Sequence, residues 1–276
     1  MNQRLRYGLN FIKYWLFAKH RKGHGIHSPF LFQLITKVLN NKNINSDLKK
    51  VFTIYDKYKK SRKVIEFNEI GAKSNVLKRA RNQISPSGVL NPQRASIGRI
   101  IKTSSVNKKF GCFLYNLVNY FKPGNILELG SSVGISTSFI AQANRKSHFI
   151  SIEGIEEKIK VAKNVACELH HNTKFVTSNL DDSLENIIKE FDKLDFVYFD
   201  ANHTKESTLK YFNLCINKSH NDSVFVFDDI HWSKGMEEAW AEIKNNKNVR
   251  LSVDLYRMGL IFFRKELSKE HYVIKF

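Results

Sequence analysis

The sequence has few cysteines and no long apolar run. Its three cysteines, Cys112, Cys167 and Cys215, lie far apart and none belongs to a C-x-x-C pair, so neither a disulfide framework nor a zinc site is indicated. No run of 18 apolar residues occurs, and the apolar stretch within RYGLNFIKYWLFAKHRK is too short and too interrupted for a signal peptide. We therefore expect a cytoplasmic protein, and its 276 residues suffice for a full hydrophobic core.

Acidic residues are scarce in the first half of the chain. Residues 1–124 hold 25 Lys and Arg against 4 Asp and Glu, a net charge of +21, whereas residues 125–276 hold 20 against 22, a net charge of −2. A general drift of composition towards lysine would have raised the charge of both halves. A positive field confined to residues 1–124 indicates an acidic partner, and RNA, an anionic membrane surface and an acidic protein all qualify.

The second half alternates short β-rich runs with helix-like segments. The runs NILEL, SHFISIE, TKFVTS, LDFVYFD and SVFVFDD are each followed by such a segment, which predicts an α/β fold with a doubly wound, mostly parallel sheet. The stretch NVRLSVDLYRMGLIFFRK predicts a C-terminal antiparallel hairpin that turns near residues 256–258. We predict seven strands in a domain spanning residues 107–276.

The first 106 residues predict a basic, mainly helical region. FIKYWLFAKHRK has the pattern of a basic amphipathic helix, HGIHSPF that of a polar turn, and LFQLITKVLN that of a second helix. Further on, KSNVLKRARNQISPSG and PQRASIGRIIKTSSVNKKF combine Arg and Lys with Ser, Asn and Gln. This mixture suits phosphate contacts and equally suits a solvated helical face, and no nucleic-acid-binding motif accompanies it.

Polar residues stand at the end of every predicted parallel strand. A glycine turn of the form E-x-G-x-x-x-G runs from Glu128 to Gly134, and in doubly wound sheets ligands bind beyond the carboxyl ends of the strands. Ordinary loops and helix caps also place polar residues there. That explanation is weaker for Glu128, inside an apolar strand, and for Asp228 and Asp229, which end one. The strand-end residues are Glu128 to Gly134, Glu153, Ser178, Asn179, Asp200, Asp228 and Asp229.

In this order and spacing, these motifs resemble the class I S-adenosylmethionine-dependent methyltransferases, most closely the catechol-type and caffeoyl-type O-methyltransferases. The resemblance covers roughly residues 107–265 and implies a Rossmann-like fold with adenosylmethionine as the cofactor. It implies that Glu128 offsets the positive charge of the cofactor's amino-acid end, that Glu153 accepts hydrogen bonds from the ribose hydroxyls, and that Asn179 reads the adenine amino group. The cofactor-binding residues implied by the match are Glu128, Gly130, Ser131, Gly134, Ser136, Glu153, Asn179 and Asp200.

On the acceptor side the chain departs from the catechol-type pattern. Those relatives hold a divalent metal with two aspartates and an asparagine, and they place a lysine base three residues after the first aspartate. The matching metal positions here are Asp200, Asp228 and Asp229, which implies Mg²⁺ or another divalent cation. The alternative is that one carboxylate caps a helix and another contacts the cofactor. His203 stands in place of the lysine, and imidazole can take a proton near neutral pH, so we expect His203 and Asp200 to be catalytic.

Three functions compete at this point. The first is O-methyl transfer to a small hydroxylated or phenolic acceptor, with the basic N-terminal region acting as a lid, as the contact of a homodimer or as a membrane-surface anchor. The second is methylation of tRNA or rRNA, with residues 1–124 gripping the backbone. The third is cofactor binding without catalysis. The strand-end carboxylates favour the first, and the charge asymmetry favours the second.

Overall fold

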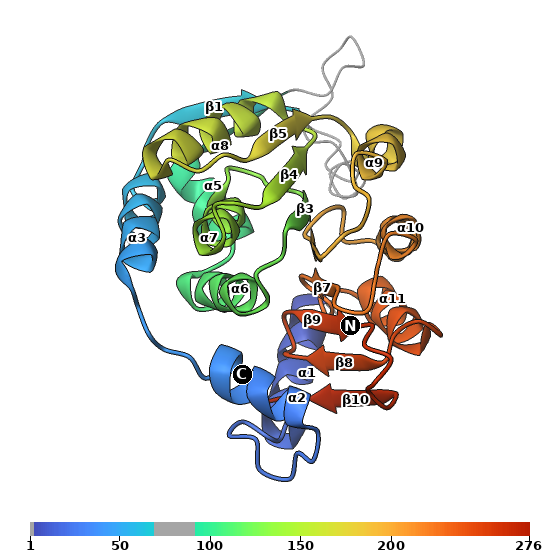
Figure 1. Ribbon diagram of the computed structural model, residues 1–276. Coiled ribbons are helices and arrows are strands. Elements are labelled where there is room, and N and C mark those ends of the chain that lie inside the picture. Colours follow the sequence, from blue (N-terminus) through green and yellow to red (C-terminus); the bar gives the residue numbers. More distant parts are fainter. Residues whose placement is uncertain (1–2, 69–91) are drawn as a thin grey trace. The chain divides into compact units, whose positions relative to one another are not determined.

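The computed structural model describes residues 3–68 and 92–276 (Figure 1), so the predicted phosphate-contact segment at residues 73–88 lies outside the described part. The chain separates into two compact units. Unit 1 comprises Met1–Lys42, Pro123–Leu127 and Leu184–Phe276, and unit 2 comprises Asn43–Lys122 and Glu128–Ser183. The predicted division between residues 106 and 107 stays a prediction.

Backbone hydrogen bonds join eight strands in the order β10-β8-β9-β7-β6-β3-β4-β5. The pairs β4–β5, β6–β7 and β8–β10 are parallel, whereas β9 runs antiparallel to both β7 and β8. The predicted doubly wound, mostly parallel sheet and its antiparallel hairpin are therefore confirmed. The strands are β3 (Asn125–Leu129), β4 (His148–Glu153), β5 (Lys174–Thr177), β6 (Phe196–Phe199), β7 (Val224–Phe227), β8 (Leu251–Asp254), β9 (Gly259–Phe262) and β10 (Glu270–Val273).

The predicted number of seven strands needs correction, because β10 forms an eighth. β10 pairs with β8 through backbone hydrogen bonds, among them Glu270 N to Arg250 O at 2.8 Å and Ile274 N to Asp254 O at 2.9 Å. The sequence EHYV is short, alternates intermediate and exposed positions, and follows the polar run RKELSK. Its strand conformation depends on a long-range pairing that local composition does not reveal.

Most of the N-terminal residues that the structure describes are helical, as predicted, although they also include an antiparallel pair of strands, β1 (Val64–Phe67) and β2 (Gln93–Ser96). The first helix, α1, spans Gln3–Phe17, and so begins earlier and ends earlier than the predicted FIKYWLFAKHRK segment. His20 and Gly23 follow it with positive φ angles of 59° and 81°, which a continuing helix does not allow. Among the described residues, no helix is long and apolar enough to cross a membrane.

The helices after α1 begin at side-chain caps in several places. Ser28, Asn45, Ser96, Asn107, Thr204 and Ser233 each accept a hydrogen bond from a backbone amide in the first turn of the following helix. These helices are α2 (Pro29–Gln33), the π-helix η1 (Leu34–Leu39), α3 (Ser46–Lys59), α5 (Ile97–Ser104), α6 (Lys108–Phe121), α7 (Ile135–Ala143), α8 (Glu156–Leu169), α9 (Leu180–Ile188), α10 (Lys205–Ile216) and α11 (Lys234–Asn245).

Close aromatic packing fixes the strand ends of unit 1. The rings of Phe199 and Phe227, the last residues of β6 and β7, stack at 4.3 Å between centroids. Trp240 of α11 packs over Gly259, where an added Cβ would lie 2.6 Å from the indole ring. Because these contacts leave no spare volume, the loops that follow β6 and β7 start from rigid positions.

Candidate functional site

The glycine turn between β3 and α7 forms a tight loop in unit 2. Gly130, Ser132 and Gly134 all have positive φ angles, of 97°, 47° and 81°. A Cβ on Gly134 would lie 2.9 Å from the Cα of Ala162 in α8, so only glycine fits there. The amides of Gly130 and Ser131 donate to the carbonyl of Ile152, at 2.8 and 3.2 Å, and thereby fasten the loop to β4.

Glu128 is fully buried beneath this loop, and only one of its two carboxylate oxygens accepts hydrogen bonds from described residues. Oε2 accepts hydrogen bonds from Thr137 Oγ1 at 2.5 Å and from Ser151 Oγ at 2.6 Å. Burial raises the pKa of Glu128, and the hydroxyls of Ser136, Ser151 and Thr137 oppose that rise. Oε1 has no hydrogen-bond partner among the described residues. A buried carboxylate oxygen without a donor is costly, and a cationic donor would satisfy it.

Two serine hydroxyls of the loop resemble Glu128 Oε1 in their lack of hydrogen bonds to described residues. Ser131 Oγ and Ser132 Oγ are buried and have no hydrogen-bond partner within the described part of the chain. Together with Glu128 Oε1, they place three unsatisfied polar atoms in the loop. This set suits a ligand that carries both an ammonium group and hydrogen-bonding oxygens, as the amino-acid end of adenosylmethionine does.

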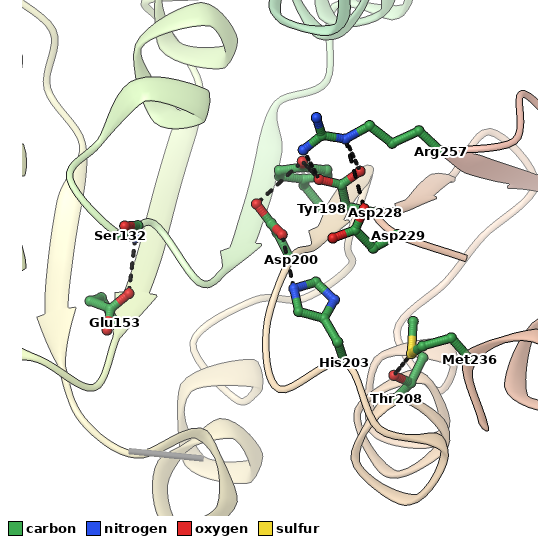
Figure 2. A network of polar contacts seen from close by, with 10 residues as sticks. All are labelled: Ser132, Glu153, Tyr198, Asp200, His203, Thr208, Asp228, Asp229, Met236 and Arg257. Atoms are coloured by element: carbon green, nitrogen blue, oxygen red, sulfur yellow. Dashed lines mark hydrogen bonds and ion pairs between the residues drawn. The ribbon is translucent and has the colours of Figure 1, made fainter. Parts of the chain in front are cut away.

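Glu153, at the end of β4, is tied to the same loop. Its Oε2 accepts from Ser132 N at 2.9 Å (Figure 2). Its Oε1 accepts from Ile155 N at 3.0 Å. A carboxylate oxygen has two lone pairs, so these bonds leave each oxygen able to accept one more hydrogen bond. Glu153 is therefore held in a fixed orientation that is compatible with the predicted contact to ribose hydroxyls.

Asn179 has a structural role at the start of α9. Its Oδ1 accepts from Asp181 N at 3.1 Å, and its carbonyl accepts from Asp182 N at 3.2 Å. These contacts are those of a helix cap, which was the competing explanation for polar residues at strand ends. The adenine contact of Asn179 stays a prediction.

The three predicted acceptor-side carboxylates lie in unit 1, after β6 and β7. Phe199 pairs with Phe227 in the parallel ladder, and Asp228 N donates to Phe199 O at 2.9 Å, which brings Asp200 and Asp228 together. The hydroxyl of buried Tyr198 lies 3.2 Å from Asp228 Oδ2 and 3.4 Å from Asp200 Oδ2 (Figure 2). A hydroxyl has a single proton, so it donates to one of the two carboxylates at a time.

Arg257, in the turn between β8 and β9, brings a positive charge to Asp228 and Asp229. Its Nε donates to Asp228 Oδ1 at 3.0 Å and its Nη2 to Asp228 Oδ2 at 2.9 Å, while Nε lies 3.9 Å from Asp229 Oδ1. Burial lowers the pKa of Arg257, but the charge and hydrogen bonds of Asp228 outweigh burial, so the pKa of Arg257 is raised overall. Sequence reasoning missed Arg257 and Tyr198. A cation in a tight turn between two apolar strands was the one available signal for Arg257.

The carboxylates do not fit the predicted divalent metal. Both oxygens of Asp228 are engaged by a bidentate guanidinium, and the side chain of Asp228 is only 1% exposed. Within residues 3–68 and 92–276, no group of three or more His, Cys, Asp or Glu residues could hold a metal ion. The positive charge beside Asp228 and Asp229 comes from Arg257 instead, and Asp200 pairs with His203.

His203 lies beside Asp200 in the loop between β6 and α10. Its Nε2 is 3.4 Å from Asp200 Oδ1, and the two side chains are 19% and 14% exposed. The loop is strained, because Asn202 and His203 have φ angles of 60° and 40°. Burial would lower the pKa of His203, but the hydrogen bond to Asp200 and the charges of the three aspartates raise it. Burial and the charge of Asp228 raise the pKa of Asp200. The pair can therefore share and transfer a proton.

Aromatic side chains from α1 and from the β8–β9 turn lie near this cluster. The Tyr7 ring is 5.0 Å from that of Tyr256 and 5.9 Å from that of Trp232, which is 40% exposed. Burial and the charge of Asp229 raise the pKa of Tyr7. His231 stacks on Tyr256 and bonds to Asp254 at 2.8 Å, so it supports the turn. The N-terminal helix thus contributes an aromatic ring close to the carboxylates.

Residues 127–230 match a protein-family model described as a methyltransferase domain. The matched segment begins within β3 and continues past Asp229, so it contains every predicted site residue. This match confirms the predicted resemblance to a methyltransferase over residues 127–230. Comparison with curated proteins gives no significant match.

Similar solved structures share the fold at low identity. An O-methyltransferase from Bacillus cereus in complex with SAH is 19% identical, and the match covers 84% of this chain and 97% of that one with a TM-score of 0.52. The O-methyltransferase TomG from Streptomyces achromogenes, in complex with SAM, is 13% identical over 96% and 99% of the two chains, with a TM-score of 0.52. SAH-bound PaMTH1 from Podospora anserina is 12% identical over 82% and 99%, also with a TM-score of 0.52. The predicted Rossmann-like methyltransferase fold is confirmed.

Proposed function

We propose that this protein is an S-adenosylmethionine-dependent O-methyltransferase that acts on a small hydroxylated or phenolic acceptor. The observation that carries the proposal is the group of three unsatisfied polar atoms, Glu128 Oε1, Ser131 Oγ and Ser132 Oγ, in the glycine loop of a methyltransferase domain. The Bacillus cereus and Streptomyces achromogenes O-methyltransferases, which were solved with SAH and SAM, support the same cofactor.

Unit 2 supplies the residues that would hold the cofactor. Glu128 pairs with the ammonium group, the hydroxyls of Ser131 and Ser132 bond to the amino-acid end, and Glu153 accepts from the ribose hydroxyls. Gly130 and Gly134 permit the loop's conformation. Ser136 is nearly buried at the start of α7 and acts through Glu128, whose pKa it helps to hold down. When bound, the cofactor supplies a methyl group already activated by its sulfonium.

Unit 1 supplies the group that takes the proton of the methyl acceptor's hydroxyl. In the tautomer that carries its proton on Nε2, facing Asp200, His203 leaves Nδ1 free to take the proton of the acceptor hydroxyl. With its proton taken by His203, the acceptor oxygen would be the nucleophile for the methyl group that bound adenosylmethionine supplies. Asp200 holds the imidazole and stabilises it once it is charged, and Arg257 keeps the charge of Asp228 and Asp229 balanced.

The ring of Trp232, which is 40% exposed and lies 5.9 Å from that of Tyr7, favours an aromatic acceptor, because planar rings pack well against an exposed aromatic side chain. Neither the geometry nor the compared O-methyltransferases add support for the RNA alternative, and we do not propose it.

Methyl transfer can be tested directly with labelled adenosylmethionine. We expect transfer to at least one member of a panel of phenols and catechols, with release of adenosylhomocysteine, and a drop of at least 100-fold in kcat for His203→Ala. Asp222→Asn, a change at an exposed surface ion pair, serves as the matched control and should keep full activity. Transfer to total RNA without transfer to any phenol would contradict the assignment.

A further inference from the structure

Helix α1 exposes an aliphatic stripe to solvent. Leu5, Leu9, Ile12 and Leu16 follow one another at spacings of four, three and four residues, and are 58%, 44%, 55% and 62% exposed. At about 100° per residue this spacing places all four on one narrow face of the helix. Large apolar side chains gathered on an exposed face usually mark a surface that binds something.

The opposite face of α1 is already occupied within unit 1. Tyr14 is 8% exposed, its ring lies 5.2 Å from that of Tyr256, and its hydroxyl donates to Ile274 O at 2.6 Å. Arg6 Nη2 and Asn10 Nδ2 donate to the two carboxylate oxygens of Glu237 at 3.0 and 2.8 Å. These contacts fix the rotation of the helix, so the exposed stripe cannot turn inward to the core of unit 1.

Positive charge surrounds the stripe. No acidic residue occurs before Asp47, whereas Lys13, Lys19, Arg21 and Lys22 are all exposed. A second copy of the chain packed on the same face would bring these like charges together. An anionic lipid surface offers both an apolar layer for the stripe and a negative headgroup layer for the lysines and arginine.

We propose that α1 binds the surface of an anionic lipid bilayer, with Leu5, Leu9, Ile12 and Leu16 inserted at the boundary between headgroups and acyl chains. Trp15 and Phe17, which are 54% and 74% exposed, lie to either side of the stripe and add aromatic surface that can contact the lipid. The helix has 15 residues and lies along the surface, since a span needs about 20. This surface is independent of the proposed methyl transfer.

Vesicle co-sedimentation of the full chain tests the proposal. Wild-type protein should pellet with vesicles of phosphatidylcholine and phosphatidylglycerol in a 70:30 ratio, and at least 10-fold less with pure phosphatidylcholine. Ile12→Glu combined with Leu16→Glu should lower partitioning at least 10-fold. Ile44→Glu, which makes the same change at a residue 47% exposed outside α1, is the control and should bind within twofold of wild type.

The substituted side chains are exposed, so the double variant should keep the wild-type circular dichroism spectrum and melting temperature. Raising the salt concentration should weaken binding, because screening reduces the attraction of the cations to the headgroups. Absence of wild-type binding to anionic vesicles would overturn the proposal. So would a wild-type dimer in light scattering that the double variant converts to monomer, because the stripe would then be a contact between copies.

Discussion

The guanidinium of Arg257 holds both carboxylate oxygens of Asp228, at 3.0 and 2.9 Å. The contact joins the turn between β8 and β9 to the end of β7, and it places a permanent cation where the catechol-type pattern predicted a divalent metal.

Removing Arg257 should destabilise the protein. Arg257→Ala leaves Asp228 buried without its cation, and breaking one partner of a buried pair costs about 3 kcal/mol in free energy of unfolding. Urea denaturation measures the change. Arg264→Ala is the matched control, since its partner Asp222 is 62% exposed, and it should cost at most about 1 kcal/mol. Equal costs for the two variants would show that the Arg257 contact is weak.

Chelation should leave turnover unchanged. Because Arg257 occupies both oxygens of Asp228, the wild-type enzyme should have the same kcat with excess EDTA as with added Mg²⁺. The measurement is an initial-rate assay after overnight dialysis against chelator. A loss of activity that Mg²⁺ restores would mean that the guanidinium does not replace the metal.

The rate should rise with pH as His203 loses its proton. Imidazole is a base only when neutral, and the pKa of His203 is raised above the ordinary value of about 6.5, so kcat/KM should increase through a midpoint above that value. Asp200→Asn removes a hydrogen bond and a charge that raise this pKa, so the midpoint should move to lower pH while the maximal rate falls.

A pH–rate profile of wild type, Asp200→Asn and the surface control Asp222→Asn distinguishes this role from a structural one. The control profile should superimpose on that of wild type. A midpoint that stays in place in Asp200→Asn would mean that another group provides the base.

Gly134→Ala should disrupt the cofactor loop. Alanine at this positive φ is strained, and its Cβ would lie 2.9 Å from Ala162, so we expect a loss of about 1 to 3 kcal/mol in stability and weakened cofactor binding. Gly235→Ala is the control, because a Cβ there meets only ordinary contacts from 3.5 Å outward at the start of α11. Thermal unfolding with and without adenosylhomocysteine measures both effects, and a neutral Gly134→Ala would mean that α8 yields to the added methyl group.

The alternation of strands and helices was predictable because the central parallel strands β3, β4, β6 and β7 are largely buried, mostly apolar runs bounded by turn residues. β6 and β7, FVYF and VFVF, are buried at every position. β10 was not predictable, because an edge strand with alternating exposure has no such signature. Its pairing with β8 is set by chain segments that are distant in sequence until the fold forms.

The candidate site was predictable where a residue is unusual for its place. Glu128 stands out in a strand that is otherwise apolar, and Asp228 ends another. Arg257 and Tyr198 were missed, since an arginine in a turn and a tyrosine in a strand are ordinary locally. Their roles arise from contacts between separate elements, and those contacts also changed the interpretation of Asp228 and Asp229 from metal ligands to partners of a guanidinium.

We expect the glycine loop of unit 2 to bind adenosylmethionine through Glu128. Calorimetric titration of the folded protein with adenosylmethionine and adenosylhomocysteine measures this binding. Glu128→Gln is compared with Glu156→Gln, a change at an exposed carboxylate on α8 that serves as control. We predict micromolar binding by wild type and Glu156→Gln, and at least 10-fold weaker binding by Glu128→Gln. Failure of folded wild-type protein to bind either compound would contradict the account.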